Sequence, residues 1–178
     1  MYNTMNRFFI IIVIIGLLVL PAIFFLNQQK AKFVKEDYAG LYVKRSVDGD
    51  TLVLSDGERV RLIGIDTPEV HESEKLYRDS RRSGQDIRTI QALGRRSWDF
   101  TKSLVEGKPV RLEFDVEKRD KYGRLLAYVY LEDGQFVNAE IVRQGYASLM
   151  TYPPNVKYED LFLKLYQEAR ENKRGLWK

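Results

Sequence analysis

The sequence predicts an α+β domain, a five-stranded and partly open β-barrel with three α-helices, that follows one apolar N-terminal segment. Three observations lead to this fold. Short β-type runs recur between turn signals, helical periodicity appears after the third and after the fifth run, and the chain begins with a long apolar stretch. A length of 178 residues suits one domain and such an appendage.

The apolar stretch covers residues 8–26, and its only irregular members are Gly16 and Pro21. At the helical rise this length spans the hydrocarbon core of a bilayer, and a helix of a small soluble domain has no need to be apolar all round. We therefore predict a transmembrane anchor, with a cleaved signal peptide as the alternative. Residues 1–7 form a short tail before it, and residues 27–37 form a polar linker after it.

Residues 38–178 form the predicted domain, which begins with three sequential antiparallel strands. Each strand is a run that alternates between apolar and polar residues or is rich in β-branched ones, and turn signals separate the runs. The runs are residues 41–47, 51–54 and 59–65, and the turns are residues 48–50 and 55–57.

The second half of the domain mixes helices with two further strands. Residues 71–90 are dense in charge of both signs and are interpreted as an exposed loop or a solvated helix. After them we expect a helix at 91–105, strands at 110–116 and 125–131, a short helix that Asn138 caps, and a final helix after residues 153–155. This order fits the OB-fold, a partly open five-stranded barrel that commonly binds oligonucleotides.

Composition excludes several kinds of chemistry. The chain has no cysteine, which rules out disulfides, thiolate zinc sites and cysteine nucleophiles. A net charge of +4 permits a polyanionic partner without demonstrating one. The single histidine, His71, stands in the charged segment and is interpreted as a solvated loop residue rather than a metal ligand.

Three stretches, residues 48–51, 61–69 and 119–124, place charged side chains in turns or at strand ends, where they can converge. Cleavage of a phosphodiester needs a hard cation held by oxygen ligands, and carboxylates from Asp50 and Asp66 suit calcium or magnesium. Glu69 is a candidate base that takes a proton from water. Arg61 and Arg124 are candidates for stabilising the charge of the transition state. Each stretch alone is typical of an ordinary turn, so the prediction depends on their ordered combination.

With these motifs in one order, residues 43–177 resemble the staphylococcal (micrococcal) nuclease family. The matching blocks are residues 48–51, 61–69, 120–128, 137–138 and 142–145. The resemblance implies an OB-fold barrel with three helices. It also implies a calcium-dependent nuclease that hydrolyses DNA and RNA with little sequence preference.

The resemblance also implies roles for individual residues. The implied catalytic residues are Arg61, Glu69 and Arg124; the implied Ca²⁺ ligands are Asp50, Asp66 and, through its backbone carbonyl, Thr67; Asp48 is a supporting carboxylate near the metal; and the implied substrate contacts are Lys121, Tyr122 and Tyr152. Two features depart from the family pattern. The mixed-charge segment 71–90 replaces a lysine-rich loop, and a second nucleotide-facing tyrosine is missing near Met150 or Thr151, so weaker base stacking is expected.

Two other function classes stay open. The chain could be a non-catalytic nucleic-acid-binding module of the same family, or a membrane-tethered protein-interaction domain. The combined acids and arginines favour the enzyme, because crowded carboxylates beside a phosphate weaken binding unless a metal offsets them. The basic residues of the 71–90 segment could track phosphates, but the acids between them favour a solvated face of mixed charge. They are Lys75, Arg78, Arg81, Arg82 and Arg88.

The location of the domain follows from its expected chemistry rather than from flanking charges. Three lysines (Lys30, Lys32 and Lys35) follow the apolar segment, and the positive-inside rule alone would keep the domain in the cytoplasm. A nuclease without sequence preference would threaten the cell's own nucleic acids there, and calcium is abundant outside. We therefore expect a monomeric, extracytoplasmic domain that is membrane-anchored or secreted after signal cleavage.

Overall fold

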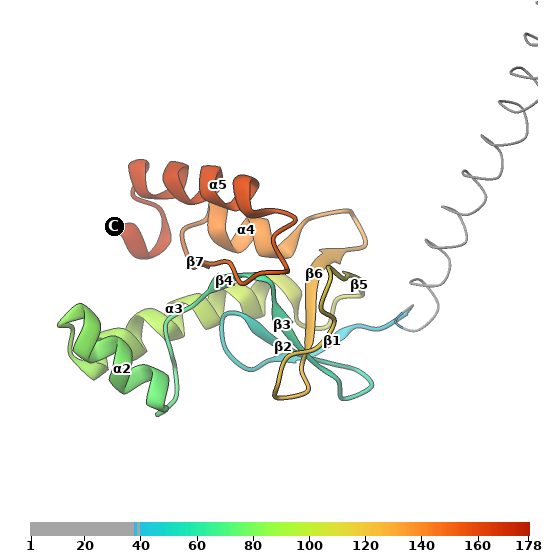
Figure 1. Cartoon of the computed structure of the whole chain (residues 1–178), viewed down its shortest axis with the longest axis horizontal. Coiled ribbons are helices and arrows are strands. Elements are labelled where there is room, and N and C mark those ends of the chain that lie inside the picture. Colours follow the sequence, from blue (N-terminus) through green and yellow to red (C-terminus); the bar gives the residue numbers. More distant parts are fainter. Residues whose placement is uncertain (1–37, 39) are drawn as a thin grey trace, which may run out of the picture. The chain divides into compact units, whose positions relative to one another are not determined.

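A computed structural model of the chain describes Tyr38 and residues 40–178 (Figure 1). The predicted tail at 1–7, apolar segment at 8–26 and linker at 27–37 lie outside the described residues. Within the part that is described, no helix has the length and apolar character needed to cross a membrane.

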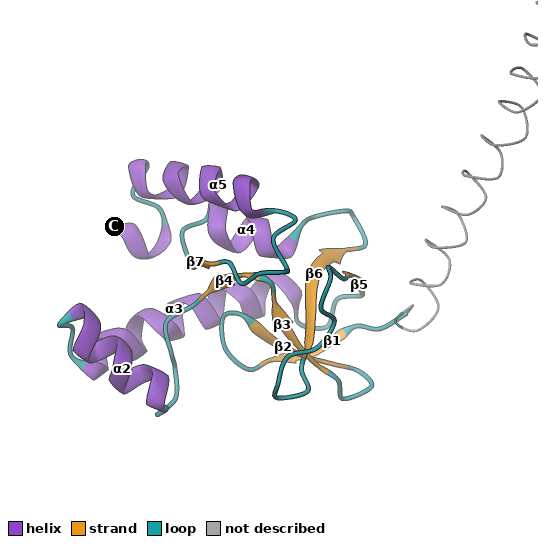
Figure 2. Cartoon of the chain, viewed as in Figure 1, coloured by secondary structure: helices purple, strands orange, loops and turns teal. Residues whose placement is uncertain are grey.

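Five strands form one mixed sheet in the order β1-β2-β3-β6-β5 (Figure 2). They are β1 (Val43–Ser46), β2 (Thr51–Leu54), β3 (Arg59–Leu62), β5 (Val110–Glu113) and β6 (Leu125–Leu131). β1, β2 and β3 pair antiparallel, which confirms the three predicted sequential strands. β6 then pairs parallel with β3 and antiparallel with β5. The parallel pair brings the start of β6 beside β3, so that residues far apart in the sequence meet.

The predicted barrel was partly open, and the observed five-stranded sheet is open between its edge strands. No continuous ladder joins the edge strands β1 and β5 in the described part of the chain. Instead, a single bridge pairs Tyr42 with Pro109, and the amides of Val43 and Val110 donate to the carbonyls of Lys108 and Leu41 at 3.0 and 2.9 Å. The architecture is therefore an α+β fold around a mixed five-stranded sheet rather than a closed barrel.

The third predicted strand is divided in two. β3 ends at Leu62, and a separate strand, β4 (Gly64–Asp66), pairs antiparallel with β7 (Ser148–Met150) in a second, two-stranded sheet. Gly64 has a φ of 81°, and a Cβ there would lie 2.5 Å from the ring of Phe162. Only glycine fits both this conformation and this contact without strain. The break redirects the chain and places Asp66 at the end of β4.

Four α-helices are present among the described residues, whereas three were predicted. They are α2 (Glu74–Ser83), α3 (Ile87–Val105), α4 (Val137–Arg143) and α5 (Glu159–Glu171), and a 3₁₀ helix, η1 (Gly175–Trp177), follows them. The additional helix, α2, forms inside the charged segment 71–90. Ser73 caps it by accepting a hydrogen bond from the amide of Leu76 at 3.1 Å, and the Leu76 side chain is fully buried. One buried residue and one cap thus stabilise a helix whose other positions, apart from the exposed Tyr77, are polar.

Asn138 was predicted to cap the short helix, but α4 begins at Val137 and Asn138 lies inside it. Its side chain is completely buried. The side-chain oxygen accepts from the amide of Val129, and the side-chain nitrogen donates to the carbonyl of Ile63, both at 3.0 Å. Asn138 therefore satisfies backbone groups of β6 and of the break between β3 and β4, because a buried carbonyl needs a partner.

Candidate active site

Three predicted residues meet at the ends of β2, β3 and β4. The Arg61 guanidinium lies between two carboxylates, with Nη1 3.2 Å from Oδ1 of Asp50 and Nη2 3.1 Å from Oδ1 of Asp66. The pairing of Thr51 with Arg61 across β2 and β3 sets this arrangement, because Asp50 immediately precedes Thr51. The structure thus brings together two predicted metal ligands and one predicted catalytic arginine.

Asp50 is the most constrained of these side chains, and only 5% of the residue is exposed. Its Oδ2 accepts from the amide and the hydroxyl of Thr67 at 2.8 and 3.1 Å, and its Oδ1 accepts from the Thr51 hydroxyl at 3.2 Å. The neighbouring Gly49 packs so closely that a Cβ there would lie 2.7 Å from the Thr67 methyl group. The loop that carries Asp50 is therefore locked against the loop that carries Thr67.

Asp48 stabilises the loop that carries Asp50. Its Oδ1 accepts a hydrogen bond from the amide of Asp50 at 3.1 Å. Burial and then the nearby Asp50 carboxylate raise the pKa of Asp48 to about 6. Asp48 therefore shapes the turn that presents Asp50, a position compatible with a supporting role near a metal.

Lys75, on α2, reaches into the same cluster. Its Nζ lies 3.1 Å from Oδ2 of Asp66, 2.9 Å from Oε1 of Glu69 and 3.0 Å from the backbone carbonyl oxygen of Thr67. Asp79, one turn further along α2, lies 3.8 Å away. Only 21% of the Lys75 side chain is exposed. The interpretation of this charged segment as a solvated face is therefore wrong for Lys75.

Glu69, the predicted base, lies beside this ammonium group. Its other carboxylate oxygen, Oε2, accepts from the hydroxyl of Ser73 at 3.3 Å. The backbone of Glu69 rests directly on α3, because a Cβ at Gly94 would lie 2.5 Å from the Glu69 carbonyl oxygen. The start of α2 and the middle of α3 together fix Glu69 at the edge of the acidic cluster.

Arg124 approaches from the start of β6. Its Nε lies 2.7 Å from Oδ2 of Asp120, while Oδ1 of the same carboxylate accepts from the Arg124 amide at 3.0 Å. Its Nη1 makes a long contact of 3.5 Å with the Thr51 hydroxyl, which in turn donates to Asp50. The second predicted catalytic arginine is thus linked to the acidic cluster through Thr51.

A cavity of about 690 Å³ lies in front of the two arginines. Arg61 and Arg124 line it, and so do the three predicted substrate contacts, which are Lys121, Tyr122 and Tyr152. Tyr122 and Tyr152 are 72% and 78% exposed, so much of each ring is accessible to a flat partner, although Lys121 and Arg124 also lie near the Tyr122 ring. Met150 also lines this cavity, at the place where a second nucleotide-facing tyrosine was missing, and its sulfur lies 3.8 Å from Nη2 of Arg61.

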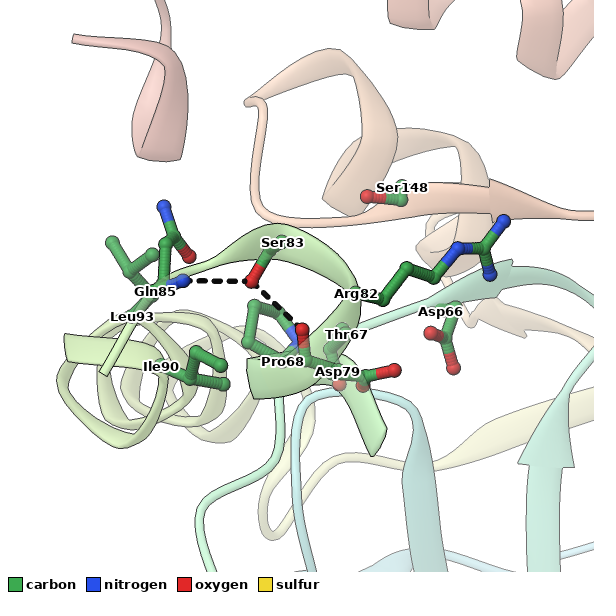
Figure 3. A pocket seen from close by; sticks show the side chains of 10 residues that line it. All are labelled: Asp66, Thr67, Pro68, Asp79, Arg82, Ser83, Gln85, Ile90, Leu93 and Ser148. Atoms are coloured by element: carbon green, nitrogen blue, oxygen red, sulfur yellow. Dashed lines mark hydrogen bonds between the residues drawn. The ribbon is translucent and has the colours of Figure 1, made fainter. Parts of the chain in front are cut away.

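A second cavity, of about 340 Å³, borders Asp66, which does not line the first cavity (Figure 3). Asp66 and Thr67 line it together with Asp79 and Arg82 of α2 and Ser148 of β7. The part that α2 plays in lining this cavity was not predicted, because its mixed charges do not indicate which face of the helix meets the site. His71, by contrast, is exposed, as predicted.

The oxygens of this cluster suit a hard cation such as calcium. Asp66 Oδ2 and the Thr67 carbonyl already converge on one cationic atom, Nζ of Lys75, and Asp50 lies across the shared Arg61. Burial is the largest influence on Asp66 and raises the pKa of this carboxyl, although Lys75 opposes the shift. No group of three or more Asp, Glu, His or Cys side chains is arranged as a metal site in the described residues. Two carboxylates and a backbone carbonyl are nevertheless typical oxygen donors for calcium.

Several known proteins are similar in sequence to this chain. The family described as "Staphylococcal nuclease homologue" matches residues 59–178. A thermonuclease from Staphylococcus intermedius is 41% identical over 138 residues, which cover 76% of this chain and 74% of that protein. A thermonuclease from Staphylococcus hyicus is 34% identical over 138 residues, or 76% of this chain and 73% of that one. Endonuclease YncB from Bacillus subtilis (strain 168) is 37% identical over 156 residues, or 85% and 64%. The chain therefore belongs to the staphylococcal nuclease family.

Proposed function

We propose that this chain is a calcium-dependent nuclease that hydrolyses the phosphodiester bonds of DNA and RNA with little sequence preference. The observation that carries the proposal is the position of Arg61. This residue lines a large cavity, and its guanidinium lies 3.2 and 3.1 Å from the carboxylates of Asp50 and Asp66. The relatives named thermonuclease and endonuclease support the same reaction class.

The proposed reaction divides its tasks among the named side chains. Asp50, Asp66 and the Thr67 carbonyl would hold calcium, which supplies positive charge that neutralises the phosphate. Glu69 takes a proton from the water that attacks phosphorus, the bond between phosphorus and the leaving sugar oxygen breaks, and that oxygen takes up a proton from solvent, while Arg61 and Arg124 donate to the non-bridging phosphate oxygens. Guanidinium groups suit this task, since each offers several fixed donors and stays charged.

The open cavity supports binding without sequence preference. Tyr122 and Tyr152 present exposed rings on which any base can stack, because every base has a flat π face. The Lys121 ammonium lies 5.0 Å from the ring centre of Tyr122 and adds positive charge for the backbone. Stacking and charge attract the nucleic acid without reading the edges of its bases.

One observation favours the alternative, a non-catalytic nucleic-acid-binding module. Lys75 pairs with Asp66 and Glu69, so it already offsets part of the acidic charge that would repel a phosphate. A module that only binds would need such neutralisation.

Incubation of the full-length chain with single-stranded DNA separates the two functions. We expect cleavage when calcium is added and none when a chelator is in excess, because the proposed reaction needs the cation to neutralise the phosphate. The measurement is the length of end-labelled DNA on a denaturing gel. Salt-sensitive binding without cleavage in calcium, magnesium or manganese would establish the binding module instead.

We also propose that residues 8–26 hold the nuclease domain outside the cytoplasm, where free nucleic acid is available and the genome is not exposed. A fusion of alkaline phosphatase to the C-terminus should be active, because that enzyme needs an oxidising compartment for its disulfides. The matched control is a fusion at the same position to a reporter that is active only in the cytoplasm. An active cytoplasmic reporter and inactive phosphatase would contradict this location.

A further inference from the structure

We propose that Lys75 is a built-in competitor of the metal ion, so that calcium binds only as the Lys75 ammonium leaves Asp66 and Thr67. The inference rests on the proposed calcium site. The ammonium lies 3.1 Å from Oδ2 of Asp66 and 3.0 Å from the Thr67 carbonyl oxygen, which are two of the three proposed calcium donors. The other oxygen of Asp66 is paired with Arg61 at 3.1 Å. Both oxygens of this carboxylate therefore already have cationic partners.

Calcium and the Lys75 ammonium cannot both bind Oδ2 of Asp66 and the Thr67 carbonyl oxygen without electrostatic repulsion. Calcium binds oxygen at about 2.3–2.6 Å. An ion held by Oδ2 of Asp66 and the Thr67 carbonyl oxygen would therefore lie close to the Lys75 ammonium, which contacts the same two atoms. Like charges at such a separation repel strongly in a partly buried site, where water screens them poorly. Calcium binding therefore has to displace Lys75 or to accept a weaker ligand set.

The structure offers a route for this displacement that leaves α2 in place. The helix is anchored by the buried Leu76 and by Ser73, which caps the helix and also donates to Glu69. The Lys75 stem has four rotatable carbons, so the ammonium can move while its backbone stays fixed. Asp79, 3.8 Å from the ammonium and more exposed than Asp66, is a second partner within reach.

Such competition would set a calcium threshold for activity. At low calcium the ammonium neutralises Asp66 and Glu69, which keeps the acidic cluster intact without a metal. At high calcium the ion takes the oxygens, and Glu69 loses one of its partners and becomes available to water. The same residue would then stabilise the metal-free domain and delay its activation.

Calcium titration of the full-length Lys75→Met variant by isothermal titration calorimetry tests this. Methionine keeps the length of the stem but has no charge, so calcium should bind on the order of tenfold more tightly, as expected for groups in direct contact. Arg81→Met is the matched control. Arg81 is exposed on the same helix and lines neither cavity, so its loss removes one positive charge without removing a contact to the donors. Its calcium affinity should stay close to that of the unmodified chain.

Thermal unfolding supplies a second measurement. Without calcium the Lys75→Met variant should melt at a lower temperature than the unmodified chain, and saturating calcium should raise its melting temperature more. If Lys75→Met is too unstable to titrate, Lys75→Gln keeps a polar tip that can donate to Thr67 and Glu69, and it should also bind calcium more tightly.

The outcomes distinguish this inference from the proposed function. Equal affinities for the unmodified chain and both Lys75 variants, or weaker binding by the variants, would overturn the competition while leaving the calcium site in place. Absence of calcium binding in all of the proteins would instead contradict the proposed metal site itself.

Discussion

Replacement of Arg124 by alanine is expected to slow DNA cleavage by about 10²- to 10³-fold, the usual cost of removing one preorganised donor to a developing charge. The fold should persist, because the Arg124 side chain is one-quarter exposed and it contacts Asp120, the Thr51 hydroxyl and the exposed ring of Tyr122 rather than apolar core residues. A single-turnover assay at saturating calcium, with labelled single-stranded DNA, measures the chemical step without interference from product release.

Arg143→Ala is the matched control for this experiment. Arg143 also pairs with an acid on its own element, with Nη1 2.8 Å from Oε2 of Glu140, but it lines neither cavity. Its loss should leave the cleavage rate unchanged. Arg124→Lys should restore only part of the rate, since lysine is charged but cannot present two parallel donors. A near-normal rate for Arg124→Ala would show that Arg124 does not act on the phosphate.

Local patterns explain why the strands of the five-stranded sheet were predictable, whereas β7 and the separate β4 were not predicted. β6 spans Leu125–Leu131, as predicted, because its apolar run follows a turn made of residues that favour turns. The antiparallel pairing of β2 with β3 was predicted and brings Asp50 beside Arg61, whereas the break at Gly64, which was not predicted, places Asp66. The family resemblance then added the roles that spacing alone could not supply.

The features that sequence reasoning missed depend on contacts between distant segments. Whether Lys75 faces solvent or Asp66 depends on how α2 packs, and a single apolar residue, Leu76, decides that. Asparagine is a common helix cap, but the side-chain amide of Asn138 forms hydrogen bonds with the backbone of β6 and of Ile63, which lie outside its own helix. Propensity describes a residue's own neighbourhood, and tertiary contacts override it at such positions.

Replacement of Asp50 tests the other half of the site. Asp50→Asn removes the charge but keeps the shape of the side chain, so its one remaining oxygen can still accept the hydrogen bonds that Thr67 donates, while the amide nitrogen can donate to the Thr51 hydroxyl but no longer accepts from it. Calcium affinity should fall by at least about 10- to 100-fold, since even residues that only support a metal ligand contribute that much. Asp50→Ala should bind calcium as poorly. It should also lower the free energy of unfolding by about 1–3 kcal/mol, because the Thr67 amide then loses a buried partner.

Calorimetric calcium titration and urea unfolding of both variants separate the two roles of this carboxylate. Asp56→Asn is the control, because Asp56 also accepts a backbone hydrogen bond in a turn, from Glu58 at 2.9 Å, but is exposed and lines neither cavity. If Asp50→Asn kept the calcium affinity of the unmodified chain, Asp50 would only hold its loop against Thr67. If it lost affinity while its unfolding curve stayed near that of the control, the charge of Asp50 would serve the metal and its hydrogen bonds would serve the fold.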